Sequence, residues 1–266
     1  MPTERINGFH IYYECAGQGV PFLFVHGGLG GGHGSALFRQ HHMALLARHA
    51  HVIAFDRRAA GLSETPTSDY SFGGFVADIM ALLDHLGHER AVLMGTSAGG
   101  PQVLQCALTH PERVMALVLG STATQTVNVP PALASLVTFL GTEGLTYLQS
   151  MLARHDTTTP ARLTAPLAPM EPLSGILQTY LAYHLHGDPI AARLGEIRVP
   201  TLILHGTADA EIPFVEAECL HAGLTASSLL PFVGGGHSIL VTHAEPYRQA
   251  IIDFLHALPG ALSAAV

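Results

Sequence analysis

Short runs of apolar residues alternate along the chain with longer segments in which apolar positions recur every three or four residues. The runs are typical of buried strands and cover residues 22–25, 52–55, 91–94, 114–119, 201–204 and 229–232. The longer segments predict helices over residues 36–47, 72–86, 98–108, 214–221 and 246–258. This alternation predicts an α/β fold with a mostly parallel, doubly wound sheet covered by helices on both faces.

Two segments depart from the alternation. Near the start, candidate strands at residues 4–6 and 10–14 flank Asn7-Gly8, a dipeptide that favours the two-residue turn of a β-hairpin. From residue 122 to residue 195 the strand pattern stops, and prolines break the sequence into short helical fragments. We therefore expect a core domain of residues 1–121 and 196–266, with residues 122–195 as a helical cap, or lid, over the catalytic edge of the sheet.

Composition narrows the classes of function. The chain has 266 residues, 48% of them hydrophobic, which suffices for one large domain with an insertion. The formal net charge is −8 and no basic run occurs, so we expect no nucleic acid partner. All 12 basic residues are arginine, which excludes chemistry that depends on a Schiff-base lysine or a P-loop lysine.

Cysteine usage and hydropathy bear on the compartment. The 3 cysteines are scattered through the chain, a pattern typical of reduced thiols. We expect no signal peptide in the first residues, and the longest apolar runs are too short to span a bilayer. We expect a cytoplasmic protein that acts on a small-molecule substrate and has no membrane partner. The oligomeric state stays open.

A serine between glycines is the first candidate for chemistry. Residues 95–99 read Gly-Thr-Ser-Ala-Gly and lie between a predicted strand and a predicted helix. A sharp, strained turn at such a junction exposes the serine oxygen, so Ser97 is the candidate nucleophile. The amide of Ala98 lies at the start of the helix, where it is expected to donate to a developing oxyanion.

Candidate partners of the serine come after two later strands. A serine nucleophile needs a base, and the base needs a carboxylate to orient it. Asp209 comes after the strand at 201–204, and His237 comes after the strand at 229–232 and a run of glycines. We expect Asp209 to be the acid and His237 the base, with Glu211 as the rival acid.

A glycine-rich segment comes directly after the first buried strand and reads His-Gly-Gly-Leu-Gly from residue 26. The amide of Gly28 is expected to complete the oxyanion hole with that of Ala98, and Leu29 is a weaker candidate for the same donor. His26 is expected to brace the loop.

Together these segments resemble the α/β-hydrolase superfamily over nearly the whole chain. The motifs occur in the superfamily's order: H-G-G at 26–28, the serine pentapeptide, H-G-x-x-D-x-x-x-P at 205–213 and G-G-G-H at 234–237. Residues 56–63 read D-R-R-A-A-G-L-S where the superfamily usually has D-x-R-G-x-G-x-S, a departure in a loop expected to be mainly structural. The resemblance implies a serine hydrolase with the triad named above and with no metal or cofactor.

Several activities stay open within that resemblance. Epoxide hydrolases and haloalkane dehalogenases carry aspartate at the nucleophile position, so Ser97 disfavours both. We expect a carboxylic ester hydrolase that acts on small to medium uncharged substrates through an acyl-enzyme, with a lactonase or a carbon–carbon bond hydrolase as alternatives. A small-ligand receptor that retains the triad is the alternative of another class. Apolar cap residues are expected to line the pocket together with Leu29, and they are Leu136, Phe139, Tyr147 and Tyr180.

Two groups of histidines are expected to play no part in catalysis. The sequence from His184 to Asp188 resembles the start of a di-zinc motif, but Pro189 replaces the motif's last histidine, so we expect no metal site. His41 and His42 are expected on a solvated face of a helix.

Overall fold

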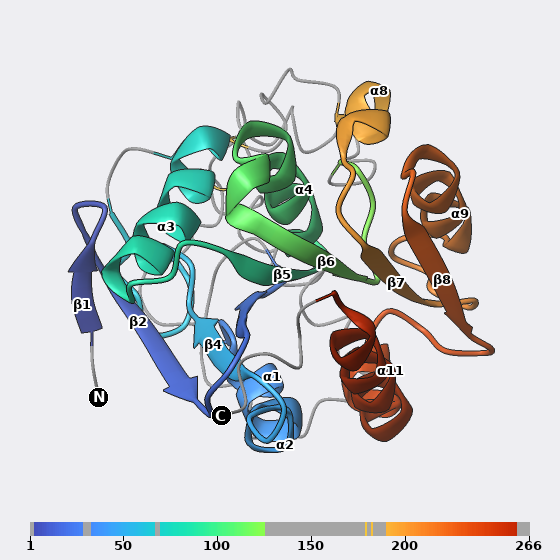
Figure 1. The fold of residues 1–266 in the computed structure, drawn as a ribbon, viewed down its shortest axis with the longest axis horizontal. Coiled ribbons are helices and arrows are strands. Elements are labelled where there is room, and N and C mark those ends of the chain that lie inside the picture. Colours follow the sequence, from blue (N-terminus) through green and yellow to red (C-terminus); the bar gives the residue numbers. More distant parts are fainter. Residues whose placement is uncertain are drawn as a thin grey trace, which may run out of the picture.

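The computed structural model describes residues 3–28, 33–66, 70–125, 179, 182 and 190–259. Within these residues the strands form one 8-stranded sheet in the order β1-β2-β4-β3-β5-β6-β7-β8 (Figure 1). The strands are β1 (Thr3–Ile6), β2 (Phe9–Ala16), β3 (Pro21–Val25), β4 (His51–Phe55), β5 (Ala91–Thr96), β6 (Val114–Gly120), β7 (Thr201–Gly206) and β8 (Ser227–Phe232). Strand β2 pairs antiparallel with β1 and β4, and the other neighbours are parallel. The predicted α/β fold with a mostly parallel sheet is confirmed.

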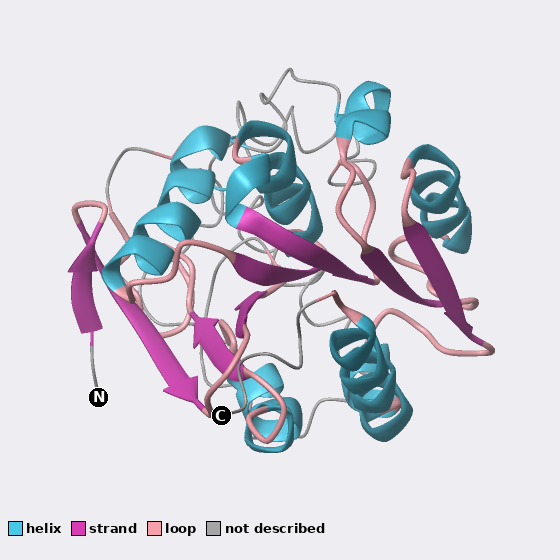
Figure 2. Ribbon diagram, in the orientation of Figure 1, coloured by secondary structure: helices cyan, strands magenta, loops and turns pink. Residues whose placement is uncertain are grey.

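Helices cover both faces of the sheet (Figure 2). The α-helices are α1 (Ala36–Phe38), α2 (Ala44–Leu46), α3 (Phe72–His85), α4 (Gly99–Thr109), α8 (Ile190–Arg193), α9 (Phe214–Gly223), α10 (Ile239–Thr242) and α11 (Ala244–Ala257). A π-helical segment, Arg39–Met43, joins α1 to α2, and 3-10 helices lie at Pro111–Arg113 and Leu194–Glu196.

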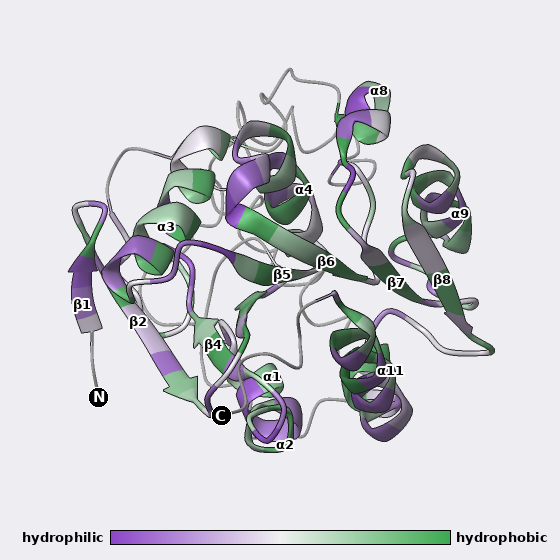
Figure 3. Cartoon of the chain, in the orientation of Figure 1, coloured by the Kyte–Doolittle hydropathy of each residue, from purple (hydrophilic) through white to green (hydrophobic). Residues whose placement is uncertain are grey.

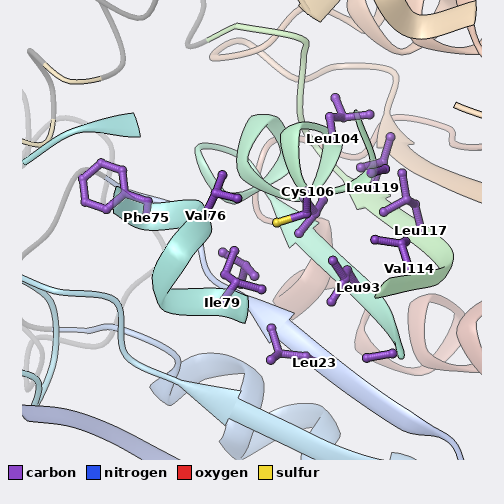
Figure 4. Packing of buried hydrophobic residues seen from close by; sticks show 14 of the residues in the cluster. Leu23, Phe75, Val76, Ile79, Leu93, Leu104, Cys106, Val114, Leu117 and Leu119 are labelled. Carbon is purple, nitrogen blue, oxygen red and sulfur yellow. The ribbon is translucent and has the colours of Figure 1, made fainter. Parts of the chain in front are cut away.

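Two hydrophobic cores lie on opposite faces of the sheet, because successive side chains of a strand point in opposite directions. Phe22 and Phe24 of β3 pack with α1 and α11, whereas Leu23 and Val25 pack with α3 and α4. Figure 4 shows the second of these cores, with Leu23 below α3. Burial on both faces explains why the central strands are continuous apolar runs, and Figure 3 contrasts them with the hydrophilic edge strand β1.

A buried ion pair fixes the loop that comes after β4. Arg58 donates from Nε and Nη2 to the carboxylate of Asp78 in α3, over 2.7 and 2.6 Å. The same carboxylate accepts from the side chain of Asn7 in the β1–β2 turn, over 2.8 Å. The guanidinium of Arg58 also lies 4.1 Å from the ring centre of Phe9. These contacts tie the loop to both the hairpin and α3, and so hold the neighbouring Arg57 in place.

One histidine differs from its predicted environment. His42 lies in the π-helical segment and is only 1% exposed, so the expectation that it faces solvent is wrong. Its Nε2 donates to the carbonyl oxygen of Leu240 over 2.6 Å, and its ring lies 5.7 Å from that of Tyr247. Burial lowers the pKa of His42 to about 4, so the ring stays neutral.

Most of the segment expected to form a cap lies outside the described residues, so its place over the sheet edge stays a prediction. Thr179 and Ala182, which belong to this segment and are described, are both buried. The residues expected to line the pocket also lie outside the described part of the chain, and they are Leu29, Leu136, Phe139, Tyr147 and Tyr180. Of the helices that the structure describes, none combines the length and the hydropathy needed to cross a bilayer.

Candidate active site

Ser97 lies on a sharp turn between β5 and α4. Its φ is +49°, a left-handed conformation that costs energy for any residue with a side chain. The flanking glycines make the turn possible, since a Cβ on Gly95 would lie 2.5 Å from the carbonyl oxygen of Gly99. A Cβ on Gly99 would collide with the carbonyl oxygen of Val25 in β3. The spacing of small residues in the pentapeptide therefore reflects how closely the turn packs.

Asp209 and His237 reach the serine from two other strand ends. The Nδ1 of His237 lies 2.9 Å from Oδ2 of Asp209, and its Nε2 lies 3.1 Å from the Oγ of Ser97. The other carboxylate oxygen of Asp209 accepts from the backbone amides of Glu211 and Ile212, each over 2.9 Å. The structure thus brings together the three side chains that the sequence spacing singled out, in an order that lets Nδ1 donate to Asp209 while Nε2 accepts from Ser97.

Electrostatics favour an ionised Asp209 beside a basic His237. Burial alone would raise the pKa of the Asp209 carboxyl, but the side chains of His205 and His237 and the Ile212 amide hold it well below its usual range. Burial likewise opposes the charged form of His237, yet the hydrogen bond with Asp209 and the negative charge of Glu211 raise its pKa above the ordinary value. The pair is therefore suited to take up a proton at Nε2.

Glu211, the rival acid, lies at the other end of the same imidazole. Its Oε2 is 3.6 Å from Nε2 of His237, whereas Asp209 bonds to Nδ1. The Asp209 side chain is 0% exposed and that of Glu211 is 37% exposed. Since the orienting acid of a triad holds the nitrogen that faces away from the nucleophile, the geometry favours Asp209 for that role.

The glycine-rich loop after β3 lies directly against Ser97. A Cβ on Gly27 would lie 2.8 Å from the Cβ of Ser97, so this position has no room for a side chain. Gly28 has a φ of +76°, a conformation that favours glycine, and it is exposed. Ala98 is the next residue after Ser97 and the N-cap residue of α4. The donor roles expected of the Gly28 and Ala98 amides stay predictions.

Arg57 holds this loop, a contact that sequence reasoning missed. Its Nη2 donates to the carbonyl oxygen of Gly27 over 3.1 Å and also to that of Gly28. His26 braces the same peptide, because its Nδ1 lies 2.7 Å from the Gly27 oxygen while its Nε2 accepts from the Arg57 amide over 3.0 Å. Burial and the charge of Arg57 lower the pKa of His26 to about 3, so the ring is neutral and can fill both roles.

Fixing the Gly27 carbonyl also fixes the Gly28 amide. The two groups belong to one planar trans peptide and point in opposite directions. Arg57 and His26 hold the oxygen from one side, so the N–H must face the other. The only sign of the Arg57 contact in the sequence was that an arginine stands at the variable second position of the D-x-R motif.

Within the described residues, no cluster of three or more histidine, cysteine or acidic side chains could hold a metal ion. The segment from His184 to Asp188 lies outside that part of the chain. The groups that the described site offers for chemistry are a hydroxyl, an imidazole, two carboxylates and backbone amides.

Comparison with known proteins gives consistent matches. A family model described as alpha/beta hydrolase fold matches residues 20–174. A relative from Pseudomonas putida, named 2-hydroxy-6-oxononadienedioate/2-hydroxy-6-oxononatrienedioate hydrolase 2, is 31% identical over 92% of this chain and 91% of its own. The enol-lactonase from Burkholderia xenovorans LB400 has a TM-score of 0.80 at 20% identity, covering 96% of this chain and 100% of that one. The esterase EaEST from Exiguobacterium antarcticum has a TM-score of 0.79 at 23% identity, and the match covers 95% of this chain and 98% of that one.

Proposed function

Since the chain belongs to the α/β-hydrolase fold family, we propose that it is a serine esterase that cleaves carboxylic esters of small to medium uncharged substrates. The observation that carries the proposal is the unbroken chain of hydrogen-bond contacts from Asp209 through His237 to Ser97. A hydroxyl bonded to an imidazole that a carboxylate orients is the arrangement used for acyl transfer.

The first half of the reaction forms an acyl-enzyme. Ser97 Oγ attacks the ester carbonyl carbon while His237 Nε2 takes the hydroxyl proton. The amides of Gly28 and Ala98 stabilise the oxyanion of the tetrahedral intermediate. As the intermediate collapses, the bond from the acyl carbon to the alcohol oxygen breaks, and His237 returns the proton to the leaving alcohol.

The second half hydrolyses the acyl-enzyme. His237 takes a proton from a water molecule whose oxygen attacks the acyl carbon, and the same two amides stabilise the second intermediate. The bond to Ser97 Oγ then breaks, the proton returns to the serine, and a carboxylic acid leaves. Throughout, Asp209 keeps Nδ1 protonated and stabilises the imidazolium.

The uncharged substrate is proposed from the apolar side chains expected in the cap. A preference for uncharged substrates would distinguish this chain from the Pseudomonas putida relative, which is named after a dioate, a compound with two carboxylates. A lactone requires the same attack on an ester carbonyl and differs only in that the alcohol stays attached to the acyl group.

The proposal is tested with p-nitrophenyl esters from acetate to long-chain acids, a set of simple lactones and a 2-hydroxy-6-oxodienoate. We expect sustained turnover of the shorter esters, measured as continuous release of p-nitrophenolate. A single release of product per protein molecule would contradict the proposal and favour a ligand receptor. Hydrolysis of the dienoate without hydrolysis of any ester would assign carbon–carbon bond cleavage instead.

The pH profile gives a second prediction. For a neutral ester, kcat/KM should fall as the pH drops through the pKa of His237, because only the neutral imidazole can accept the serine proton. The pKa of His237 is raised, so the midpoint should lie above the ordinary histidine value of about 6.5. Initial rates in buffers of constant ionic strength measure it, and a midpoint below that value would contradict the pairing of His237 with Asp209.

Arg57→Met gives a third prediction. Methionine retains much of the length of the side chain but cannot donate to the Gly27 and Gly28 carbonyls. Loss of a direct oxyanion donor costs about 10²- to 10³-fold in kcat. Loss of a group that only orients the donor should cost less, roughly 10- to 100-fold in kcat, with KM nearly unchanged. Steady-state kinetics with one p-nitrophenyl ester separates the two constants.

Arg48→Met is the matched control for this substitution, because Arg48 is exposed and lies outside the site. It should leave both constants unchanged. Circular dichroism should show that both variants are folded. If Arg57→Met raises KM and leaves kcat unchanged, Arg57 does not act through the oxyanion-binding loop.

A further inference from the structure

The loop between β7 and α9 supplies two carboxylates to the two ends of one imidazole. Asp209 bonds to Nδ1 of His237, whereas Glu211 lies 3.6 Å from Nε2, the nitrogen that also contacts Ser97 over 3.1 Å. The mechanism uses Asp209 and leaves Glu211 without a role. Yet Glu211 is the carboxylate on the side of the ring where bonds form and break.

The distances confine the Glu211 charge to the neighbourhood of the scissile bond. Its Oε2 lies within about 7 Å of Ser97 Oγ, because the separations of both atoms from Nε2 set that limit. A substrate carbonyl must approach Oγ to about 3 Å before attack. Any charged group within a few bonds of that carbonyl therefore lies close enough to Glu211 for a Coulomb interaction that solvent only partly screens.

We propose that Glu211 selects substrates by charge, disfavouring esters with a carboxylate close to the scissile bond and favouring uncharged ones. This inference rests on the proposed esterase function and names a feature of the site that favours an uncharged substrate. The same repulsion acts on the carboxylate product after deacylation and speeds its departure.

Two features of the site weaken the repulsion between Glu211 and an anionic substrate. Glu211 is 37% exposed, so water reduces the repulsion. The positive charge of Arg57 also attracts an anionic group, although its guanidinium is already bound to the carbonyls of Gly27 and Gly28. We therefore expect discrimination of about 3- to 10-fold in kcat/KM rather than exclusion of anions.

The test compares monomethyl succinate with methyl succinamate, its uncharged amide of nearly the same shape. The wild-type protein should hydrolyse the amide-bearing ester with the higher kcat/KM, measured by chromatographic assay of methanol. In Glu211→Gln the preference should shrink by about 3- to 10-fold, chiefly through faster reaction of the anionic ester. Raising the ionic strength should reduce the preference in the wild type more than in the variant.

Glu218→Gln serves as the control, since Glu218 is an exposed acid of α9 outside the site. It should leave the preference unchanged. A preference that Glu211→Gln does not alter would overturn the inference while leaving the esterase function intact. If the wild type hydrolyses neither methyl ester nor any p-nitrophenyl ester, the proposed function fails and the inference fails with it.

A pH profile provides a readout that a merely structural role of Glu211 would not move. The imidazole of His237 is in contact with Asp209, Glu211 and Ser97, and Glu211 is among the groups that raise its pKa. Glu211→Gln should therefore move the midpoint of kcat/KM for methyl succinamate to lower pH. An unchanged midpoint would show that the charge of Glu211 does not affect the pKa of His237.

Discussion

Replacing Ser97 by alanine is expected to reduce ester turnover by about 10⁶-fold, the loss found when the nucleophile of a serine hydrolase is removed. Alanine retains the Cβ and removes only the oxygen that lies 3.1 Å from His237 Nε2. It faces the same backbone cost at a φ of +49° as serine, so the fold should be unchanged. Steady-state release of p-nitrophenolate measures the loss, and a thermal melt checks the fold.

Ser238→Ala is the control, because Ser238 is an exposed serine directly beside His237. It should retain nearly full activity. An organophosphonate that carries a p-nitrophenol leaving group should add one covalent adduct to the wild type and to this control, and none to Ser97→Ala. Activity that survives in pure Ser97→Ala would remove the basis for an acyl-enzyme mechanism at this site.

The strands could be predicted from sequence because most of them are buried on both faces. In β3, Phe22 and Phe24 enter one core while Leu23 and Val25 enter the other, so every position must be apolar. A run without polar interruption then marks the strand directly. The Gly27-Gly28 pair after it marks its end, since close packing against Ser97 excludes a side chain at Gly27.

The helix predicted over residues 36–47 shows where the periodic pattern fails. The segment is helical over most of its length, but its central turn, Arg39–Met43, is a π-helix. His42 is buried there because its ring finds the carbonyl of Leu240, 198 residues further along the chain. A polar residue can be buried when one distant partner satisfies it, and periodicity contains no information about that partner.

Some features of the candidate site could likewise be predicted from the sequence, and others could not. Ser97, Asp209 and His237 could be chosen from sequence because parallel strands deliver the loops at their C-terminal ends to one edge of the sheet. The position of Glu211 beside Nε2, opposite the Asp209 that holds Nδ1, could not be predicted, because a loop residue can turn its side chain to either end of an imidazole. The contacts of Arg57 could not be predicted either, since they join it to Gly27 and Gly28 in a different loop.

Asp209→Asn is expected to reduce kcat/KM for a neutral ester by about 10³- to 10⁴-fold. The oxygen of asparagine can still accept from the Glu211 and Ile212 amides, as Oδ1 of Asp209 does now. Its NH₂ group then faces His237 Nδ1, which must become the acceptor, and the ring proton moves to Nε2. In that tautomer Nε2 cannot take the proton of Ser97. The loss therefore comes from the wrong tautomer and from the missing charge, in a protein that stays folded.

Glu211→Gln distinguishes this explanation from the alternative in which Glu211 is the acid that orients the imidazole. Both carboxylates lie on one loop and both face the imidazole, so a general loss of negative charge would affect the two variants alike. If Asp209 orients Nδ1, Glu211→Gln should change kcat/KM for a neutral ester by less than about 10-fold, because the tautomer is unaffected. The same kinetic assay and a thermal melt of each variant decide the matter. A larger loss in Glu211→Gln than in Asp209→Asn would make Glu211 the orienting acid and would require the loop to rearrange before catalysis.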